Sequence, residues 1–204
     1  MATILPLFAV PLFIADLESK YDTDFLKDPS LYERMIADNG YYTLDKNILN
    51  HPRLASLKAD LEQQVRNFTG FLKMIPEVEF YITSSWVVKH QKDDWGTKHY
   101  HANSIISGVY YFDVHPDSGD IIFENEQDNL FGKTLKFRYH EPDFFNAVDW
   151  AITPANGTVV LFPSHLAHRI APNYNNNDRY CIAFNVFVKG ILGRGSKLSE
   201  LELK

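Results

Sequence analysis

Histidines gather in the C-terminal half of the chain at spacings that could serve a metal ion. His99 and His101 are two residues apart, directly after a polar loop at residues 93–98. In an extended backbone, residues two apart point to the same side, so both imidazoles can face one centre. A pair of exposed loop histidines has the same spacing, so this motif alone does not establish a site.

A second pair, His165 and His168, lies in the segment 161–172, which follows an apolar strand-like stretch. The segment ends in a short β-like stretch, which would bring one of the two imidazoles back across a barrel. The two histidines therefore compete for the role of a third ligand. For His165 we favour the ordinary interpretation, a hydrogen-bonded structural histidine.

Arg179 opens the apolar segment that runs to Asn185. An arginine in such a position is commonly an exposed charge at the edge of a sheet. It can also lie buried against a carboxylate, which its planar guanidinium binds through two parallel hydrogen bonds. The residue alone does not decide between these interpretations.

The elements that must position these side chains change in character near residue 78. Before it, Asn50 and Pro52 open the clearest helix, and a weaker helix is predicted over residues 30–38, ending at Gly40. The clearest helix has apolar residues at spacings of three and four, which form one face: Leu54, Leu57, Leu61, Val65, Phe68 and Leu72.

After residue 78 the pattern is one of short strands and turns. Strands are predicted at residues 78–88, 104–112, 120–123, 134–138, 150–153, 158–162 and 179–188, with turn signals between them. This spacing predicts a mainly β fold with α+β content: a double-stranded β-helix, or jelly roll, with the N-terminal helices packed on one sheet. We expect a single domain over 1–204, divided into an N-terminal strand and helices (1–77), the β core (78–188) and a C-terminal tail (189–204).

Composition excludes several partners. The net charge of -6 argues against nucleic acid as a bulk partner, because phosphate binding needs a basic surface. The single cysteine, Cys181, permits no internal disulfide. The apolar run at residues 4–14 is interrupted by Pro6 and Pro11 and is too short to span a bilayer. We therefore expect a soluble, cytoplasmic protein without a membrane partner.

Four motifs together resemble one family. They are His-x-His-x-Asn-Ser at 99–104, Ser-Gly-Val-Tyr-Tyr at 107–111, Phe-Pro-Ser-x-x-x-His at 162–168 and Arg-x-x-Ile-x-Phe-Asn at 179–185. In this order they resemble the Fe(II)/2-oxoglutarate-dependent oxygenases, and within them the small single-domain proteins of that superfamily. The distal His-x-Ile-x-Pro at 168–172 is also similar to prolyl hydroxylases. The resemblance spans roughly residues 78 to 188.

The resemblance implies a dioxygenase that uses Fe(II), 2-oxoglutarate and dioxygen, and that releases succinate and CO2 while hydroxylating a C–H bond. The iron ligands that it implies are His99, His101 and His168. Arg179 would bind the distal carboxylate of 2-oxoglutarate, with Tyr111 either as a second donor or as a plain core aromatic. Asn103 and Ser104 would support the site through hydrogen bonds. The substrate, a small molecule or a peptide, is not readable.

One residue departs from the usual triad of two histidines and a carboxylate, because His101 stands at the carboxylate position. Three interpretations follow. His101 is a true third ligand, which we favour, or Asp113 or Glu124 completes the triad, or the site holds another metal with altered catalysis.

Two other classes compete with the oxygenase. A cupin-type metal protein also has a His-x-His and a distal His, but residues 104–107 read Ser-Ile-Ile-Ser, without the glutamate that common cupins carry there. A non-enzymatic jelly-roll binding module would use exposed aromatics such as Trp86, Trp95 and Trp150. Residues 190–204 could pack on a second copy, which would make a homodimer.

Overall fold

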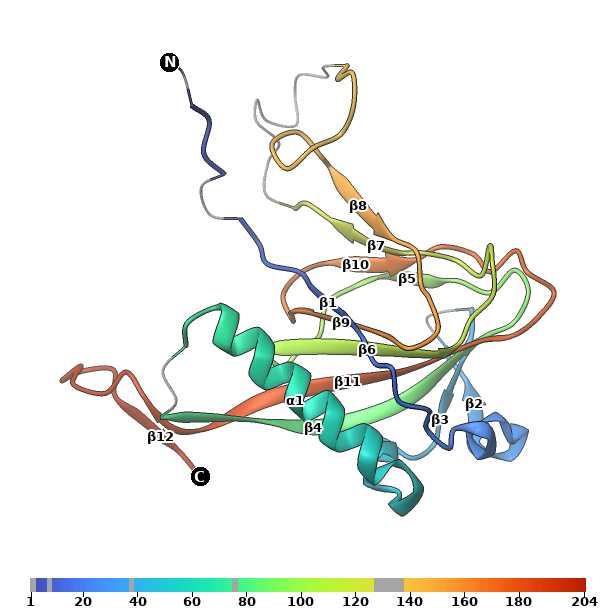
Figure 1. Cartoon of the computed structure of the whole chain (residues 1–204), viewed down its shortest axis with the longest axis horizontal. Helices are drawn as coiled ribbons and strands as arrows, with labels where there is room; N and C mark the ends of the chain where they lie inside the picture. The colour runs from blue at the N-terminus through green and yellow to red at the C-terminus, as the bar shows by residue number, and fades with distance from the viewer. Residues whose placement is uncertain (1–2, 7–8, 37–38, 75–76, 127–137) are drawn as a thin grey trace.

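In the part of the chain that the structure describes, two antiparallel β-sheets face each other and one long helix covers the outer face of the larger sheet (Figure 1). The computed structural model describes residues 3–6, 9–36, 39–74, 77–126 and 138–204. The predicted strand at residues 134–138 falls almost entirely outside the described residues. The mainly β jelly roll expected from the sequence is confirmed.

Among the described residues the larger sheet has eight strands and the smaller sheet has four. The larger sheet contains, in spatial order, β1 (Phe13–Asp16), β9 (Thr158–Pro163), β6 (Ile106–Asp113), β11 (Arg179–Leu192), β4 (Val78–His90), β3 (Tyr41–Thr43) and β2 (Tyr32–Arg34), and β12 (Leu201–Leu203) pairs with the end of β11. The smaller sheet contains β5 (Gly96–His99), β10 (His168–Ile170), β7 (Ile121–Glu124) and β8 (Asp149–Ile152).

The central strand β11 divides the core into two layers because its side chains alternate between the faces of the sheet. Ile182, Phe184 and Val186 point to the helix side, where they join the larger apolar cluster. Cys181 and Ala183 point to the other side, between the two sheets, and line a cavity there. The strand that closes the helix-side core therefore also forms one wall of that cavity.

The clearest predicted helix is confirmed as α1 (Ala55–Phe71), which begins after two 3-10 turns, η3 (Ile48–Asn50) and η4 (Pro52–Leu54). Pro52 stands at the start of η4, where a missing N–H costs nothing. The apolar face of the helix is buried against the larger sheet, but Leu72 lies past the helix end and is partly exposed.

The second predicted helix, over residues 30–38, is wrong. The chain there forms the 3-10 turn η2 (Pro29–Leu31) and then β2, which pairs with β3. β3 in turn pairs with β4, with Tyr41 opposite Lys89. Pairing with the edge of a large sheet outweighs the weak local helix preference, and no local spacing reveals that partner. The other 3-10 turn of this region is η1 (Asp24–Lys27).

β11 also continues four residues beyond the predicted end of its strand, to Leu192, and β12 folds back on it. In the described part of the chain, no helix is both long and apolar enough to cross a membrane.

Candidate metal centre

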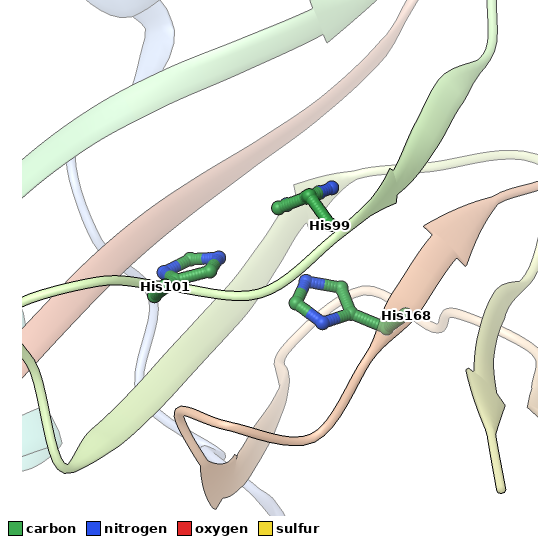
Figure 2. A group of neighbouring side chains, drawn as sticks. All are labelled: His99, His101 and His168. Carbon is green, nitrogen blue, oxygen red and sulfur yellow. The ribbon is translucent and has the colours of Figure 1, made fainter. Parts of the chain in front are cut away.

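Three histidines from two segments of the chain come together between the two sheets (Figure 2). His99 ends β5, His101 follows two residues later, and His168 begins β10. One ring nitrogen from each lies within 4.8 Å of those of the other two. His99 and His168 are brought together because they are direct partners in the β5–β10 ladder.

The loop that carries His101 is attached to the segment that precedes β10. The His101 amide donates to the carbonyl of Ser164 (3.0 Å), and the Ser164 amide donates to the carbonyl of Ile105 (3.1 Å). These two main-chain bonds hold the His-x-His segment against the turn at residues 164–167. The two motifs, which begin 63 positions apart in the sequence, thus form one unit.

In each of the three imidazoles, Nδ1 is engaged with a carbonyl-type oxygen. The acceptors are the Thr97 carbonyl for His99 (2.8 Å), the Leu166 carbonyl for His168 (3.0 Å) and Asn185 Oδ1 for His101 (2.6 Å). A carbonyl oxygen only accepts, so Nδ1 carries the proton and Nε2 keeps its lone pair. A metal-binding histidine needs this tautomer and this kind of support.

Two of the imidazoles, those of His168 and His101, are also held in the neutral form that binds metal. Burial, together with the neighbouring His99 and His101, lowers the pKa of His168 to about 3. Burial is also the main reason that the pKa of His101 is lowered. Metal binding at neutral pH therefore requires no loss of a proton from either ring.

The oxygen that supports His101 belongs to Asn185, which the sequence shows only as the last residue of a strand motif. Asn185 donates through Nδ2 to Ser84 Oγ (3.3 Å) and accepts from Ser107 Oγ (3.3 Å). Asn103, to which we assigned a supporting role, is exposed in a turn with φ of 55° and does not line the cavity. Ser104 donates to main-chain carbonyls of Ile106 and Val186 and accepts from Ser164 Oγ (2.9 Å). Ser164 is hydrogen-bonded in turn to Ser107, so Ser104 connects through these hydroxyls to the Asn185 oxygen that supports His101.

The two carboxylates that could replace His101 as a ligand are engaged elsewhere. Asp113 pairs with Lys27 (2.7 Å). Glu124 pairs with Lys98 (2.9 Å) and Arg169 (3.0 Å), on the face of β7 opposite to Phe123, whose ring packs near His168. His165, the competitor of His168, is exposed and lies outside the cluster. Among the described residues the cluster is formed by histidines alone.

A cavity of about 220 Å³ adjoins the cluster. All three histidines line it, and its walls are otherwise mostly apolar. The wall residues are Met35, Trp86, Val88, Gly96, Gly108, Val109, Ile121, Phe162, Ile170, Cys181 and Ala183. Two further residues that line the cavity, His90 and Arg179, have fully buried polar side chains.

Arg179 is 0% exposed, and one edge of its guanidinium has no partner. Nη1 donates to Nδ1 of His90 (3.0 Å), whereas Nε and Nη2 have no acceptor among the described residues. Nε and Nη2 form one of the two edges through which a guanidinium binds a carboxylate bidentately. We call this edge the Arg179 fork. A buried, unpaired cation is costly, so the fork fits an anionic ligand that enters the cavity.

Tyr111 is a further buried donor beside Arg179, although it is not among the residues that line the cavity. Its ring centre lies 5.2 Å from the guanidinium carbon of Arg179, and its hydroxyl has no partner among the described residues. Burial raises the pKa of this hydroxyl well above its usual range, so it remains a donor. The cavity therefore presents neutral nitrogen ligands and, separately, donors for a carboxylate.

The comparisons with known proteins agree with this chemistry. Residues 84–185, half of the chain, match the family model described as "Putative 2OG-Fe(II) oxygenase". The chain belongs to this family. It is thus a 2-oxoglutarate-dependent oxygenase, with Fe(II) and 2-oxoglutarate as its cofactor and co-substrate. The matched segment begins within β4 and ends within β11, so it contains the three histidines and Arg179. No protein of curated function matches the chain in sequence.

Solved structures share the fold at low identity. An oxidoreductase of the 2OG-Fe(II) oxygenase family from Burkholderia pseudomallei is 17% identical, with a TM-score of 0.50 over 72% of this chain and 65% of its own. HygX from Streptomyces hygroscopicus, with nickel, 2-oxoglutarate and hygromycin B bound, is 12% identical, with a TM-score of 0.54 over 87% and 83%. A Trichoplax adhaerens prolyl hydroxylase, in complex with a peptide fragment of the hypoxia inducible factor oxygen degradation domain, is 13% identical, with a TM-score of 0.52 over 80% and 73%.

Proposed function

We propose that this oxygenase hydroxylates a C–H bond of its substrate, with release of succinate and CO2, at a centre held by His99, His101 and His168. The observation that carries the proposal is one cavity that unites both halves of the required chemistry. It has three imidazoles with free Nε2 atoms and a buried, unpaired Arg179 fork. Neither half has an obvious use without the other, because the fork needs an anion and the imidazoles need a metal ion.

In this proposal the histidines bind iron through Nε2 and Arg179 binds the distal carboxylate of 2-oxoglutarate. Three imidazoles would hold Fe(II) and would leave it accessible to the 2-oxo acid group of the co-substrate. When bound, Fe(II) and 2-oxoglutarate supply the oxidising power for the reaction. Tyr111 donates to the same carboxylate, and the apolar walls exclude water from the reacting atoms.

His101 is the third ligand in this proposal rather than a carboxylate. Asp113 and Glu124 are both paired with cations away from the cluster, whereas His101 is oriented by Asn185. A neutral ligand in place of a carboxylate makes the centre one unit more positive. We therefore expect weaker discrimination against soft metals than at a site with a carboxylate ligand.

The primary substrate approaches past Trp86 in this proposal. Trp86 lines the cavity and also a neighbouring hollow of about 360 Å³, whose other wall residues are Tyr42, Lys46 and Ser84. Its ring centre lies 6.0 Å from that of His101. A substrate that extends from this hollow would place one end beside the metal. Both a small molecule and a peptide side chain suit such an approach.

Succinate release tests the proposed function directly. Purified protein reconstituted with Fe(II) under anaerobic conditions should, once oxygen is admitted, convert 2-oxoglutarate to succinate, faster with a member of a panel of peptides and metabolites. Mass spectrometry of the stimulating compound should show the gain of one oxygen atom. A protein that binds iron but neither binds nor consumes 2-oxoglutarate would rule out the proposal.

A further inference from the structure

We propose that His90 is a positioning residue for the co-substrate: it holds the guanidinium of Arg179 so that the Arg179 fork faces a carboxylate. This inference rests on the proposed function and extends it to a residue outside the recognised motifs. His90 ends β4, where it is the direct ladder partner of Arg179 on β11. Both side chains are fully buried and line the same cavity.

The direction of the hydrogen bond between the two residues fixes the state of His90. A guanidinium donates only, so Nδ1 of His90 must be the acceptor in the 3.0 Å bond from Arg179 Nη1. The proton of the neutral ring is then on Nε2. Burial, reinforced by the Arg179 charge, lowers the pKa of His90 to about 3, so the acceptor form prevails at neutral pH.

This bond selects which edge of the guanidinium remains free. Because Nη1 is engaged with His90, the edge made of Nε and Nη2 is the one that stays unpaired. An arginine without this restraint can rotate about its side-chain torsions and present other donors, which would weaken bidentate binding. His90 thus stabilises the bound geometry before the ligand arrives.

The β2–β3 hairpin packs behind the imidazole of His90. A Cβ added to Gly40 would lie 2.7 Å from Cδ2 and 3.0 Å from Nε2 of His90. Only a residue without a side chain therefore allows the hairpin to approach the ring this closely. Asn173 Nδ2 donates to the His90 carbonyl (3.1 Å) and fixes the main chain as well. The hairpin that replaces the predicted helix is in this way part of the support of Arg179.

The experiment compares two nearly isosteric variants of the full-length protein, His90→Asn and His90→Leu. Asparagine can place Oδ1 near the position of Nδ1 and accept from Arg179, whereas leucine cannot. Binding is measured by calorimetry on anaerobic Fe(II)-loaded protein with two probes: 2-oxoglutarate, and 2-oxovalerate, which has no distal carboxylate. We expect His90→Leu to weaken 2-oxoglutarate binding by about tenfold or more. His90→Asn should stay within about threefold of the wild type, and 2-oxovalerate should bind all three proteins equally.

Matched controls separate positioning from general damage. Gly40→Ala, which presses on the imidazole, should also weaken 2-oxoglutarate selectively, whereas Gly70→Ala meets no atom within 4 Å and should not. His51→Asn changes a histidine outside the cavity, whose Nδ1 accepts from the Arg53 amide, and should leave both affinities unchanged.

Three outcomes would overturn the proposal. Wild-type affinity of His90→Leu for 2-oxoglutarate would show that Arg179 needs no support. An equal loss of both probes would show a merely structural role. If His90→Asn binds 2-oxoglutarate as weakly as His90→Leu, a hydrogen-bond acceptor for Arg179 Nη1 is not what residue 90 contributes. A wild-type protein that binds 2-oxovalerate and 2-oxoglutarate equally would instead show that Arg179 does not bind a carboxylate, which contradicts the proposed function as well.

Discussion

His99 and His168 face each other across the β5–β10 ladder, with ring centres 4.4 Å apart, although 69 positions separate them in the chain. Their proximity is therefore a property of the backbone of the smaller sheet rather than of flexible side chains. The third imidazole, His101, reaches the same point from the loop after β5, with its ring centre 5.3 Å from each of the others.

This arrangement predicts that His168→Ala abolishes iron binding. Two remaining imidazoles leave four positions to weak ligands, so affinity should fall by several orders of magnitude, as measured by metal titration of anaerobic protein. His165→Ala is the matched control, because His165 is exposed in the turn just before β10. This variant should retain nearly full binding. The reverse pattern would show that the metal is held by the other histidine.

Arg179→Leu should raise the 2-oxoglutarate concentration needed for half-maximal succinate formation by about 100-fold or more. The loss removes two charge-assisted hydrogen bonds, each of which contributes about 1.5–3 kcal/mol, and leucine leaves no buried charge behind. Metal affinity should change little, because Arg179 is hydrogen-bonded to His90 and to none of the three metal-binding histidines. Normal succinate formation at the wild-type co-substrate concentration would mean that Arg179 is only structural.

Asn185→Leu tests the support of His101. The variant removes the oxygen that accepts from Nδ1, while Ser84 and Ser107 lose only weak 3.3 Å contacts. Loss of such an outer hydrogen bond typically lowers metal affinity by about 10- to 100-fold, and metal titration measures it. Asn103→Leu, in the exposed turn two residues after His101, should leave metal affinity unchanged. If the two variants behave alike, Asn185 does not orient the ligand.

Much of this site can be predicted from local patterns, and the remainder depends on which strands pair. The two-residue spacing of His99 and His101 is enough to place them on one side of an extended segment. The strands of 8 to 14 residues, such as β6 and β11, have the apolar content that identifies them. β5 and β10 have four and three residues, too few for any period to be recognised, so the pairing of His99 with His168 is visible only in the fold.

His90 shows most clearly where the sequence is not sufficient. In the sequence it lies two residues beyond the predicted strand 78–88, although β4 extends to include it. Its importance comes from lying opposite Arg179, 89 positions later. The same holds for residues 32–34, whose sequence suits a helix until β3 and β4 provide an edge to pair with. Register between distant strands carries this information, and one sequence does not display it.

The buried state of His90 also predicts how stability depends on pH. In the unfolded chain His90 has a pKa near 6.5, whereas burial and Arg179 lower the pKa to about 3 in the folded protein. Between these values the unfolded state binds a proton that the folded state does not. The free energy of unfolding should therefore fall as the pH decreases below 6.5, and His90 should contribute up to about 1.4 kcal/mol of this loss per pH unit. Above pH 6.5, His90 is neutral in both states and should contribute no pH dependence.

Urea unfolding of metal-free wild type and His90→Asn between pH 7 and pH 4 isolates this contribution. His101 and His168 titrate in both proteins, so their effect cancels in the difference between the two curves. The variant should be less stable at pH 7, because asparagine fills the site less well, but should lose stability less steeply as the pH falls. Between pH 7 and pH 4.5, the wild type should therefore lose roughly 2 to 3 kcal/mol more of its free energy of unfolding than the variant does. Parallel curves would show that His90 binds a proton equally well in the folded and unfolded states.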